Sequence, residues 1–241
     1  MTRFQYLGIV VGFAAGIPSG ANAQAAPPLK LIADLGFVSA SGNTSVTTVT
    51  VGQTLTYTQS GWRLSQYSGA LYGRTDGEKS AEQLRFGGRI DFRLSDGIEA
   101  FLLAGWDRNH FSGIDRRFEE GIGLAFRVTG EGPALVELEI GAGATQQENT
   151  QGASTTFATG RAATRYRQSF TEKAFFQQTV EFLPNLENSD DYRVVAESSL
   201  VAPLVARLSV KASFLLKYDN FPEFGFERTD RTITTGLQFS L

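Results

Sequence analysis

The stretch from Leu84 to Leu94 reads Leu-Arg-Phe-Gly-Gly-Arg-Ile-Asp-Phe-Arg-Leu, and its residues alternate in character. The residues at even-numbered positions are mostly apolar, whereas the odd-numbered positions include Arg85, Arg89, Asp91 and Arg93. This alternation predicts a β-strand, because successive side chains of a strand point to opposite faces. In an outer-membrane barrel the apolar face meets lipid and the charged face meets the lumen. The stretch therefore favours a membrane barrel.

The same plan repeats along the chain from Leu31 onward. Strand-like runs are bounded by turn residues such as Gly, Asp and Ser. They indicate twelve strands, approximately at residues 31–41, 45–58, 62–74, 81–94, 98–110, 117–128, 134–146, 156–169, 174–184, 191–201, 205–219 and 230–241. We therefore expect an all-β fold, a transmembrane antiparallel up-and-down β-barrel.

The connections between these runs alternate in length. Tight turns are expected at residues 59–61, 95–97, 129–132 and 171–173. Longer polar connections are expected at residues 75–80, 111–117, 147–155, 187–191 and 219–229, while the connection at 41–44 is short. Outer-membrane barrels have short periplasmic turns and longer external loops, so the alternation favours such a barrel over a soluble sandwich.

Charge is segregated to one face of most runs. For example, Ile122, Leu124 and Phe126 fall on one face of their strand, and the neighbouring Arg127 falls on the other. A charged Arg or Lys on the lipid face costs about 2–4 kcal/mol at mid-membrane, so the segregation is informative. The runs 62–74 and 98–110 alternate less clearly.

The first residues have the features of an export signal. An apolar run follows Arg3, and Ala21-Asn22-Ala23 fits a cleavage site. The run is too short to cross a bilayer as a helix, which needs about 20 residues. We expect a signal peptide at residues 1–23, a periplasmic lead-in at 24–30 and a barrel at 31–241, located in the outer membrane of a Gram-negative bacterium.

Composition excludes several kinds of chemistry. The chain of 241 residues has a formal charge of -3 and no cysteine. A nucleic-acid-binding protein needs a basic face, so no nucleic-acid partner is expected. Thiolate metal sites and cysteine nucleophiles are excluded, and no spacing of acidic residues matches a defined metal site. We expect no metal and no cofactor.

Several short motifs resemble those of a known family. They are Ser41-Gly42-Asn43-Thr44, Trp62-Arg63, Asp76-Gly77-Glu78, Phe111-Ser112-Gly113-Ile114-Asp115 with Arg117, Tyr218-Asp219 and Glu227-Arg228-Thr229-Asp230. In this order, across the whole mature chain, they resemble the bacterial family of salt-induced outer membrane proteins. The resemblance implies an outer-membrane barrel with no established activity and a role linked to osmotic or salt stress.

The last strand resembles the signal that the outer-membrane assembly machinery reads. Ile233, Leu237, Phe239 and Leu241 share one face of the terminal run. The usual signal ends on an aromatic residue, whereas this chain ends on leucine. We expect these four residues to contact the assembly machinery and the belt of outward residues to contact outer-membrane lipid.

Charged residues on the lumen face are the candidates for a pore lining. They are Arg85, Arg89, Asp91, Arg93, Arg161, Arg165, Glu137, Glu139, Glu197 and Lys211, joined by Arg167 and Glu181. Rings of charged side chains set the selectivity of a pore, so these residues could select small solutes or ions. Buried charges also need partners, so the same residues could form a self-satisfied network that fills the barrel. Both readings stay open.

His110 and Ser112 are the sharpest candidates for catalysis. Residues at i and i+2 of a strand point the same way, so this histidine could activate the serine, oriented by Glu119 or Glu120. This pattern resembles outer-membrane lipid hydrolases. The leading hypothesis is a porin-like or envelope-structural protein that is not an enzyme. The alternatives are a lipid hydrolase and a soluble periplasmic ligand-binding barrel.

Overall fold

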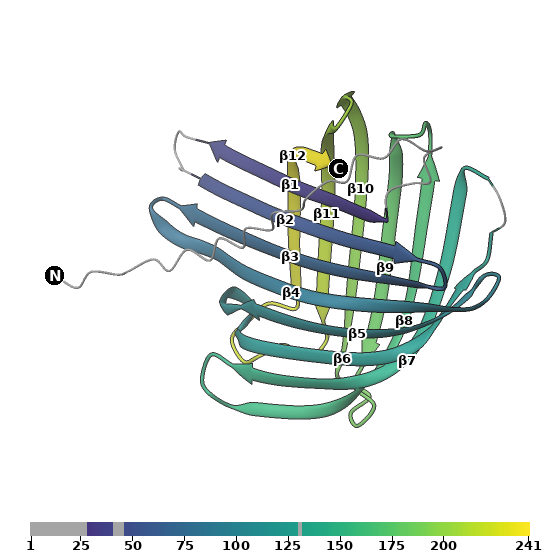
Figure 1. Ribbon diagram of the computed structural model, residues 1–241. Helices are drawn as coiled ribbons and strands as arrows, with labels where there is room; N and C mark the ends of the chain where they lie inside the picture. The colour runs from purple at the N-terminus through teal and green to yellow at the C-terminus, as the bar shows by residue number, and fades with distance from the viewer. Residues whose placement is uncertain (1–27, 41–45, 130–131) are drawn as a thin grey trace.

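Twelve antiparallel strands close into a barrel in the computed structural model, which describes residues 28–40, 46–129 and 132–241. Each strand pairs with its sequence neighbours, and β1 pairs with β12 to complete the ring (Figure 1). The predicted twelve-stranded up-and-down barrel is confirmed. The strands are β1 (Leu29–Ala40), β2 (Val46–Gln59), β3 (Trp62–Thr75), β4 (Glu78–Ser95), β5 (Ile98–Asn109), β6 (Ile114–Arg127), β7 (Ala134–Asn149), β8 (Ser154–Ser169), β9 (Phe175–Pro184), β10 (Tyr192–Val205), β11 (Leu208–Asp219) and β12 (Thr229–Ser240).

The strand boundaries lie close to those expected from the alternation. β1 begins at Leu29, two residues before the expected start of the barrel. The predicted signal peptide at 1–23, most of the lead-in and the connection at 41–44 lie outside the described residues. A short 3-10 helix, η1 (His110–Ser112), connects β5 and β6. None of the helical structure in the described ranges has the length and apolar character to cross a bilayer.

The alternation of short and long connections holds only in part. The long connection predicted at residues 75–80 is wrong, because Asp76 and Gly77 alone join β3 to β4. Both residues have positive φ, 51° and 85°, as in the type I′ turn whose twist matches that of the flanking strands. The connections after β5 and β7 are also short, since β6 begins at Ile114, before the expected residue 117, and β7 continues to Asn149, beyond the expected residue 146. The longest connections join β9 to β10 (residues 185–191) and β11 to β12 (residues 220–228).

The outward face of the barrel carries a belt of apolar side chains. Large exposed residues come from strands all round the ring, among them Phe37, Phe86, Ile122, Ile140, Leu200 and Ile233. Soluble proteins rarely expose so continuous an apolar surface, whereas lipid covers such a belt in a membrane barrel. Two outward amides satisfy each other, because Gln53 donates to the side-chain oxygen of Gln66 at 2.5 Å.

On the inward face, two aromatic rings lie flat over glycines of the neighbouring strands. Tyr67 of β3 covers Gly87 and Gly105, where an added β-carbon would lie 2.3 and 2.9 Å from the Tyr67 hydroxyl oxygen. Phe101 of β5 covers Gly123 in the same way, with 2.5 Å between an added β-carbon and ring atom Cζ. Only 1% of the Phe101 surface is exposed, so these glycines let large rings pack tightly against the wall.

We expect Gly123→Ala to lower the free energy of unfolding by about 1–3 kcal/mol, the usual cost of overpacking a tight site. The added methyl would press on Phe101 and on the carbonyl oxygen of Ile140, 2.4 Å away. Urea unfolding in lipid vesicles, followed by tryptophan fluorescence, measures the change. Gly88→Ala is the matched control, because its β-carbon meets only the Ser65 carbonyl oxygen, at 3.6 Å. Equal effects of the two substitutions would contradict the packing account.

Candidate functional site

The two ends of the barrel differ in what they carry. The backbone of Leu31 exchanges two hydrogen bonds with Leu241, so the start of β1 and the end of β12 lie at one end, called here the terminal end. The opposite end, called the loop end, carries η1 and the connections 150–153, 185–191 and 220–228. The lumen between these ends is the candidate functional site.

All ten charged residues predicted to line the lumen occupy inward positions of their strands. They contact inward residues of other strands or line cavities inside the barrel: Arg85, Arg89, Asp91, Arg93, Arg161, Arg165, Glu137, Glu139, Glu197 and Lys211. The structure divides them between two walls of different character. One wall is formed by β5 to β9 with the terminal-end parts of β3 and β4, and the other by β10 to β12, β1 and β2 with the loop-end parts of β3 and β4.

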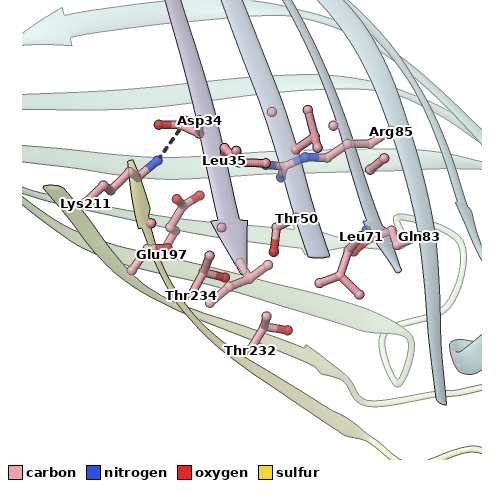
Figure 2. Close-up of a pocket in the computed structure, with 18 of the residues that line it drawn as sticks. Asp34, Leu35, Thr50, Leu71, Gln83, Arg85, Glu197, Lys211, Thr232 and Thr234 are labelled. Atoms are coloured by element: carbon pink, nitrogen blue, oxygen red, sulfur yellow. Dashed lines mark hydrogen bonds and ion pairs between the residues drawn. The ribbon is translucent and has the colours of Figure 1, made fainter. Parts of the chain in front are cut away.

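Small side chains line the second wall and leave a recess in the lumen (Figure 2). The cavity has a volume of about 100 Å³. That volume holds several water molecules, since about 10–15 Å³ of probe-occupied space holds one. Glycine, threonine and serine form part of the lining, namely Gly36, Thr50, Gly52, Gly69, Ser213, Thr232, Thr234 and Gly236, and apolar residues such as Leu71 and Leu215 also contribute. We call this cavity the recess.

Four charged side chains reach the recess. Lys211 forms an ion pair with Asp34 at 3.2 Å, and Gln238 donates to the other Asp34 oxygen at 2.9 Å. Arg85 extends from β4 along Gly69, where an added β-carbon would lie 2.9 Å from its Nε. Glu197 enters from β10 on the other side (Figure 2). Within the described part of the chain, neither Arg85 nor Glu197 has an ion pair or a side-chain hydrogen bond.

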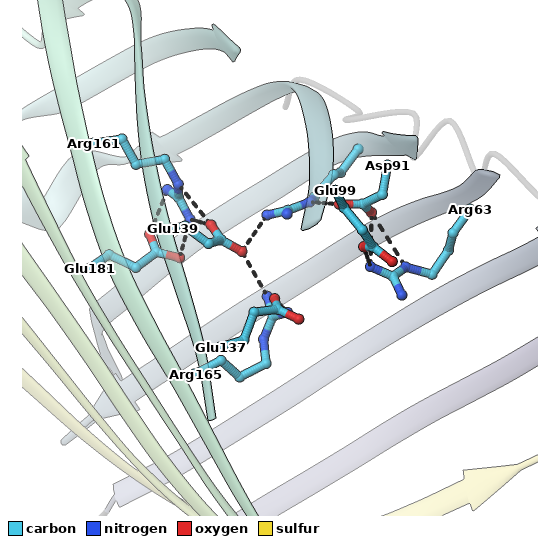
Figure 3. A network of polar contacts seen from close by, with 9 residues as sticks. Arg63, Asp91, Glu99, Glu137, Glu139, Arg161, Arg165 and Glu181 are labelled. Carbon is cyan, nitrogen blue, oxygen red and sulfur yellow. Dashed lines mark hydrogen bonds and ion pairs between the residues drawn. The ribbon is translucent and has the colours of Figure 1, made fainter. Parts of the chain in front are cut away.

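Paired charges fill the first wall (Figure 3). Arg63 of β3 contacts Asp91 at 3.3 Å and Glu99 at 2.8 Å. Arg89 of β4 contacts Asp91 and also Glu139 of β7, both at 2.7 Å. Strands β5 and β6 lie between β4 and β7 in the barrel. The Arg89–Glu139 contact therefore joins two strands that are not hydrogen-bonded neighbours.

Glu139 is the centre of this network. Besides Arg89, it contacts Arg161 at 3.2 Å and Arg165 at 3.6 Å. Its side chain is only 2% exposed, so three guanidinium groups compensate one desolvated carboxylate. Arg161 also contacts Glu181 at 3.0 Å, and Arg165 contacts Glu137 at 2.7 Å. Together with Arg63, Asp91 and Glu99, these residues form what we call the lumen network.

Nearer the loop end, one ion pair joins distant strands. Arg193 of β10 contacts Glu119 of β6 at 2.5 Å, although three strands lie between them in the ring. Arg117, next to Glu119 on the inward face, donates to the side-chain oxygen of Gln147 at 2.7 Å. These contacts show that inward side chains reach across the barrel at this level.

The connection 220–228 covers the loop end of the lumen. Glu223 accepts hydrogen bonds from Gln147 at 2.6 Å and from Asn149 at 2.8 Å, both on the inward face of β7. Phe226 packs over Gly113, where an added β-carbon would lie 2.7 Å from the ring. In either direction round the ring, at least four strands separate β12 from β5, β6 and β7. The connection therefore crosses the opening of the barrel at the loop end, called here the mouth. The sequence predicted a polar loop here but not its position.

His110 and Ser112 have separate partners. His110 Nε2 lies 2.8 Å from Asp115, whereas Ser112 donates to Asp230 at 2.6 Å and accepts from Asn109 at 2.6 Å. No hydrogen bond joins the histidine and the serine in the described ranges. The two carboxylates expected to orient the histidine lie elsewhere. Glu119 binds Arg193 in the lumen, and Glu120 is on the outward face opposite Ala104 and Ala144.

The described residues hold no group of three or more His, Asp or Glu side chains arranged to bind a metal ion. Several acidic residues of the lumen, among them Glu139 and Asp34, form ion pairs with arginine or lysine.

We expect Glu139→Gln to lower the free energy of unfolding by about 3–5 kcal/mol, because it leaves desolvated arginines without their shared counter-charge. Urea unfolding in lipid vesicles measures the loss. Glu172→Gln, in the exposed turn after β8, is the control and leaves stability unchanged. If the two variants unfold at the same urea concentration, the lumen network does not stabilise the barrel.

Solved structures share this architecture at low sequence identity. The NanC porin has a TM-score of 0.56 and 9% identity over 88% of this chain and 100% of its own. The COG4313 outer membrane channel from Pseudomonas putida F1 has a TM-score of 0.53 and 9% identity over 93% of this chain and 99% of its own. The chain therefore has a channel-like outer-membrane β-barrel fold.

Sequence similarity identifies the family. The chain is 27% identical over 223 residues to the uncharacterized protein YdiY of Escherichia coli (strain K12), covering 91% of this chain and 86% of the relative. The model of a protein family of unknown function, DUF481, matches residues 33–241. Members of this family are known as salt-induced outer membrane proteins, so the resemblance found in the sequence is confirmed. The chain belongs to the DUF481 family.

Proposed function

We propose that this protein is an outer-membrane channel that passes small polar solutes along one side of its lumen. The observation that carries the proposal is the recess, a cavity of about 100 Å³ whose wall includes eight glycine, threonine and serine residues. Hydroxyl groups and backbone amides offer polar contacts without filling space. A solute that follows this wall avoids the side chains of the lumen network.

The lumen network supports the proposal by restricting where a solute can pass. Its arginine and glutamate side chains extend into the lumen and bind one another, so they occupy the side formed by β3 to β9. The ion pair of Arg193 with Glu119 reaches further across. A narrow path beside fixed charges favours small hydrophilic solutes over large ones.

We propose the outer membrane of a Gram-negative bacterium as the location, with the terminal end in the periplasm. The apolar belt on the outward face supports membrane insertion. Ile233, Leu237 and Phe239 lie on the outward face of β12, where the assembly machinery could contact them together with the final residue, Leu241. Export by residues 1–23 and a role in salt stress stay predictions.

The experiment that tests passage is single-channel recording of the refolded protein in a planar bilayer, with Gly52→Leu as the informative variant. A β-carbon at Gly52 makes only ordinary contacts, with Asp34 at 3.8 Å, so a leucine there fits the wall and fills the recess. We expect steady ohmic steps from the native chain and a conductance reduced by roughly half in the variant.

Gly88→Leu, on the outward face opposite Gln66, is the matched control and leaves conductance unchanged. A silent bilayer with inserted native protein would overturn the channel proposal and favour a structural role in the envelope. An unchanged conductance in Gly52→Leu would show that solutes do not follow the recess.

The covering connection gives a second prediction. Glu223→Ala removes the acceptor that binds Gln147 and Asn149, so the connection loses its attachment to β7. We expect single-channel conductance to rise by roughly twofold, because the loop end of the lumen becomes less obstructed. Glu227→Ala in the same connection, for which the structure gives no such bond, is the control. Equal conductance in native protein and Glu223→Ala would exclude the connection as a barrier.

A further inference from the structure

Two charged side chains of the recess, one cation and one anion, have no partner among the described residues. Asp34 and Lys211 bind each other, and Asp34 also accepts from Gln238, so these groups compensate one another. Arg85 and Glu197 line the same cavity from β4 and β10 and form no ion pair or side-chain hydrogen bond with any described residue. Elsewhere in the lumen, the arginines and carboxylates of the lumen network are paired at 2.7–3.6 Å.

We propose that the recess binds a small zwitterionic solute, an amino acid or a related molecule that carries one carboxylate and one ammonium group. This proposal rests on the proposed channel function and names its substrate class. The carboxylate binds the Arg85 guanidinium, and the ammonium group binds the Glu197 carboxylate. One molecule thus supplies a counter-charge to each of these two side chains, which have none among the described residues.

The geometry of Arg85 fits this role. Its side chain lies along Gly69, so the chain of methylenes rests on backbone and the guanidinium projects into the recess (Figure 2). Arg85 is exposed to the lumen, which leaves its donors accessible to a solute. A guanidinium binds a carboxylate through two parallel hydrogen bonds, which orients the bound molecule as well as holding it.

The rest of the lining leaves room for a small body with polar groups, beside the apolar Leu71 and Leu215. Gly36, Gly52 and Gly236 keep side chains out of the cavity, and Thr50, Ser213 and Thr234 offer hydroxyl groups. The Asp34–Lys211 pair is neutral as a unit and repels neither end of a zwitterion. A solute with only one charge would leave either Arg85 or Glu197 uncompensated, so it binds more weakly.

Isothermal titration calorimetry on the refolded protein in detergent tests the proposal. The probes are glycine, β-alanine and γ-aminobutyrate, which carry both charges at increasing separation, and acetate and methylammonium, which carry one each. We expect one of the zwitterions to bind about tenfold more tightly than either singly charged probe. Acetate or methylammonium binding as tightly as the best zwitterion would overturn the proposal.

Charge-neutral variants then locate the binding. Arg85→Gln and Glu197→Gln should each weaken binding of the best zwitterion by about tenfold, since each loses one charge-assisted contact. Arg127→Gln, at an inward position near the terminal end and outside the recess, is the matched control and leaves affinity unchanged. The double variant Arg85→Glu with Glu197→Arg exchanges the positions of the two charges. It should bind the zwitterion as the native chain does, with the carboxylate and the ammonium group of the solute in exchanged positions. Unchanged affinity in both single variants would overturn the assignment.

Calorimetry separates failure of this proposal from failure of the channel. Binding in detergent needs no continuous path, so zwitterion binding with a silent bilayer overturns passage and keeps the site. Steady conductance without zwitterion binding overturns the site and keeps passage. Heat-modifiable gel mobility verifies that each variant has folded before either measurement.

Discussion

Pairing of charge inside a narrow ring is the constraint on which the rest of this structure depends. The outward face carries an apolar belt, so the charged residues of most strands lie on the inward face. Inside, side chains from strands as distant as β6 and β10 reach one another, as the Arg193–Glu119 contact shows. Desolvated charges are tolerated only with partners, so the lumen side chains bind each other wherever they meet. Glu139, with three arginines around it, is the clearest result.

The same constraint makes the lumen asymmetric. Where strands carry alternating arginine and glutamate, from β3 to β9, the side chains pair and occupy space. From β10 round to β4, glycine, threonine and serine stand at several inward positions, so the charged side chains there border the recess without filling it. Substitutions on the two walls should therefore affect different properties. Changes to the lumen network alter stability, whereas changes in the recess alter what can enter.

Much of the fold could be predicted from the sequence because alternation is a local property. The strand count, the strand positions and the inward direction of Arg85, Arg89 and Glu139 all follow from a period of two. The alternation was weak at 62–74 and 98–110 because Tyr67 and Phe101 point inward there, over glycines that belong to other strands. Large rings pack inside only when a distant position lacks a β-carbon, and no local pattern records that condition.

The candidate site was less predictable, since it depends on contacts between strands far apart in the sequence. Alternation could place charges in the lumen but could not show which would pair and which, like Arg85 and Glu197, would not. The catalytic hypothesis for His110 and Ser112 assumed continued strand geometry, whereas η1 and its turn give each residue its own partner. The position of Glu223 depends on the closure of the whole ring.

The connection 220–228 has a mechanical consequence for the seam where the barrel closes. In the described residues, β1 and β12 are in register only from Ile32–Ser240 to Gly36–Gly236, which leaves the loop-end half of this seam without registered pairs. At that same end, Asp230 binds Ser112 and Glu223 binds β7, so β12 is attached to the far wall where its attachment to β1 stops. Lateral separation of the first and last strands would have to stretch these bonds. The segment that covers the mouth thus also acts as a brace against opening of the barrel toward the bilayer.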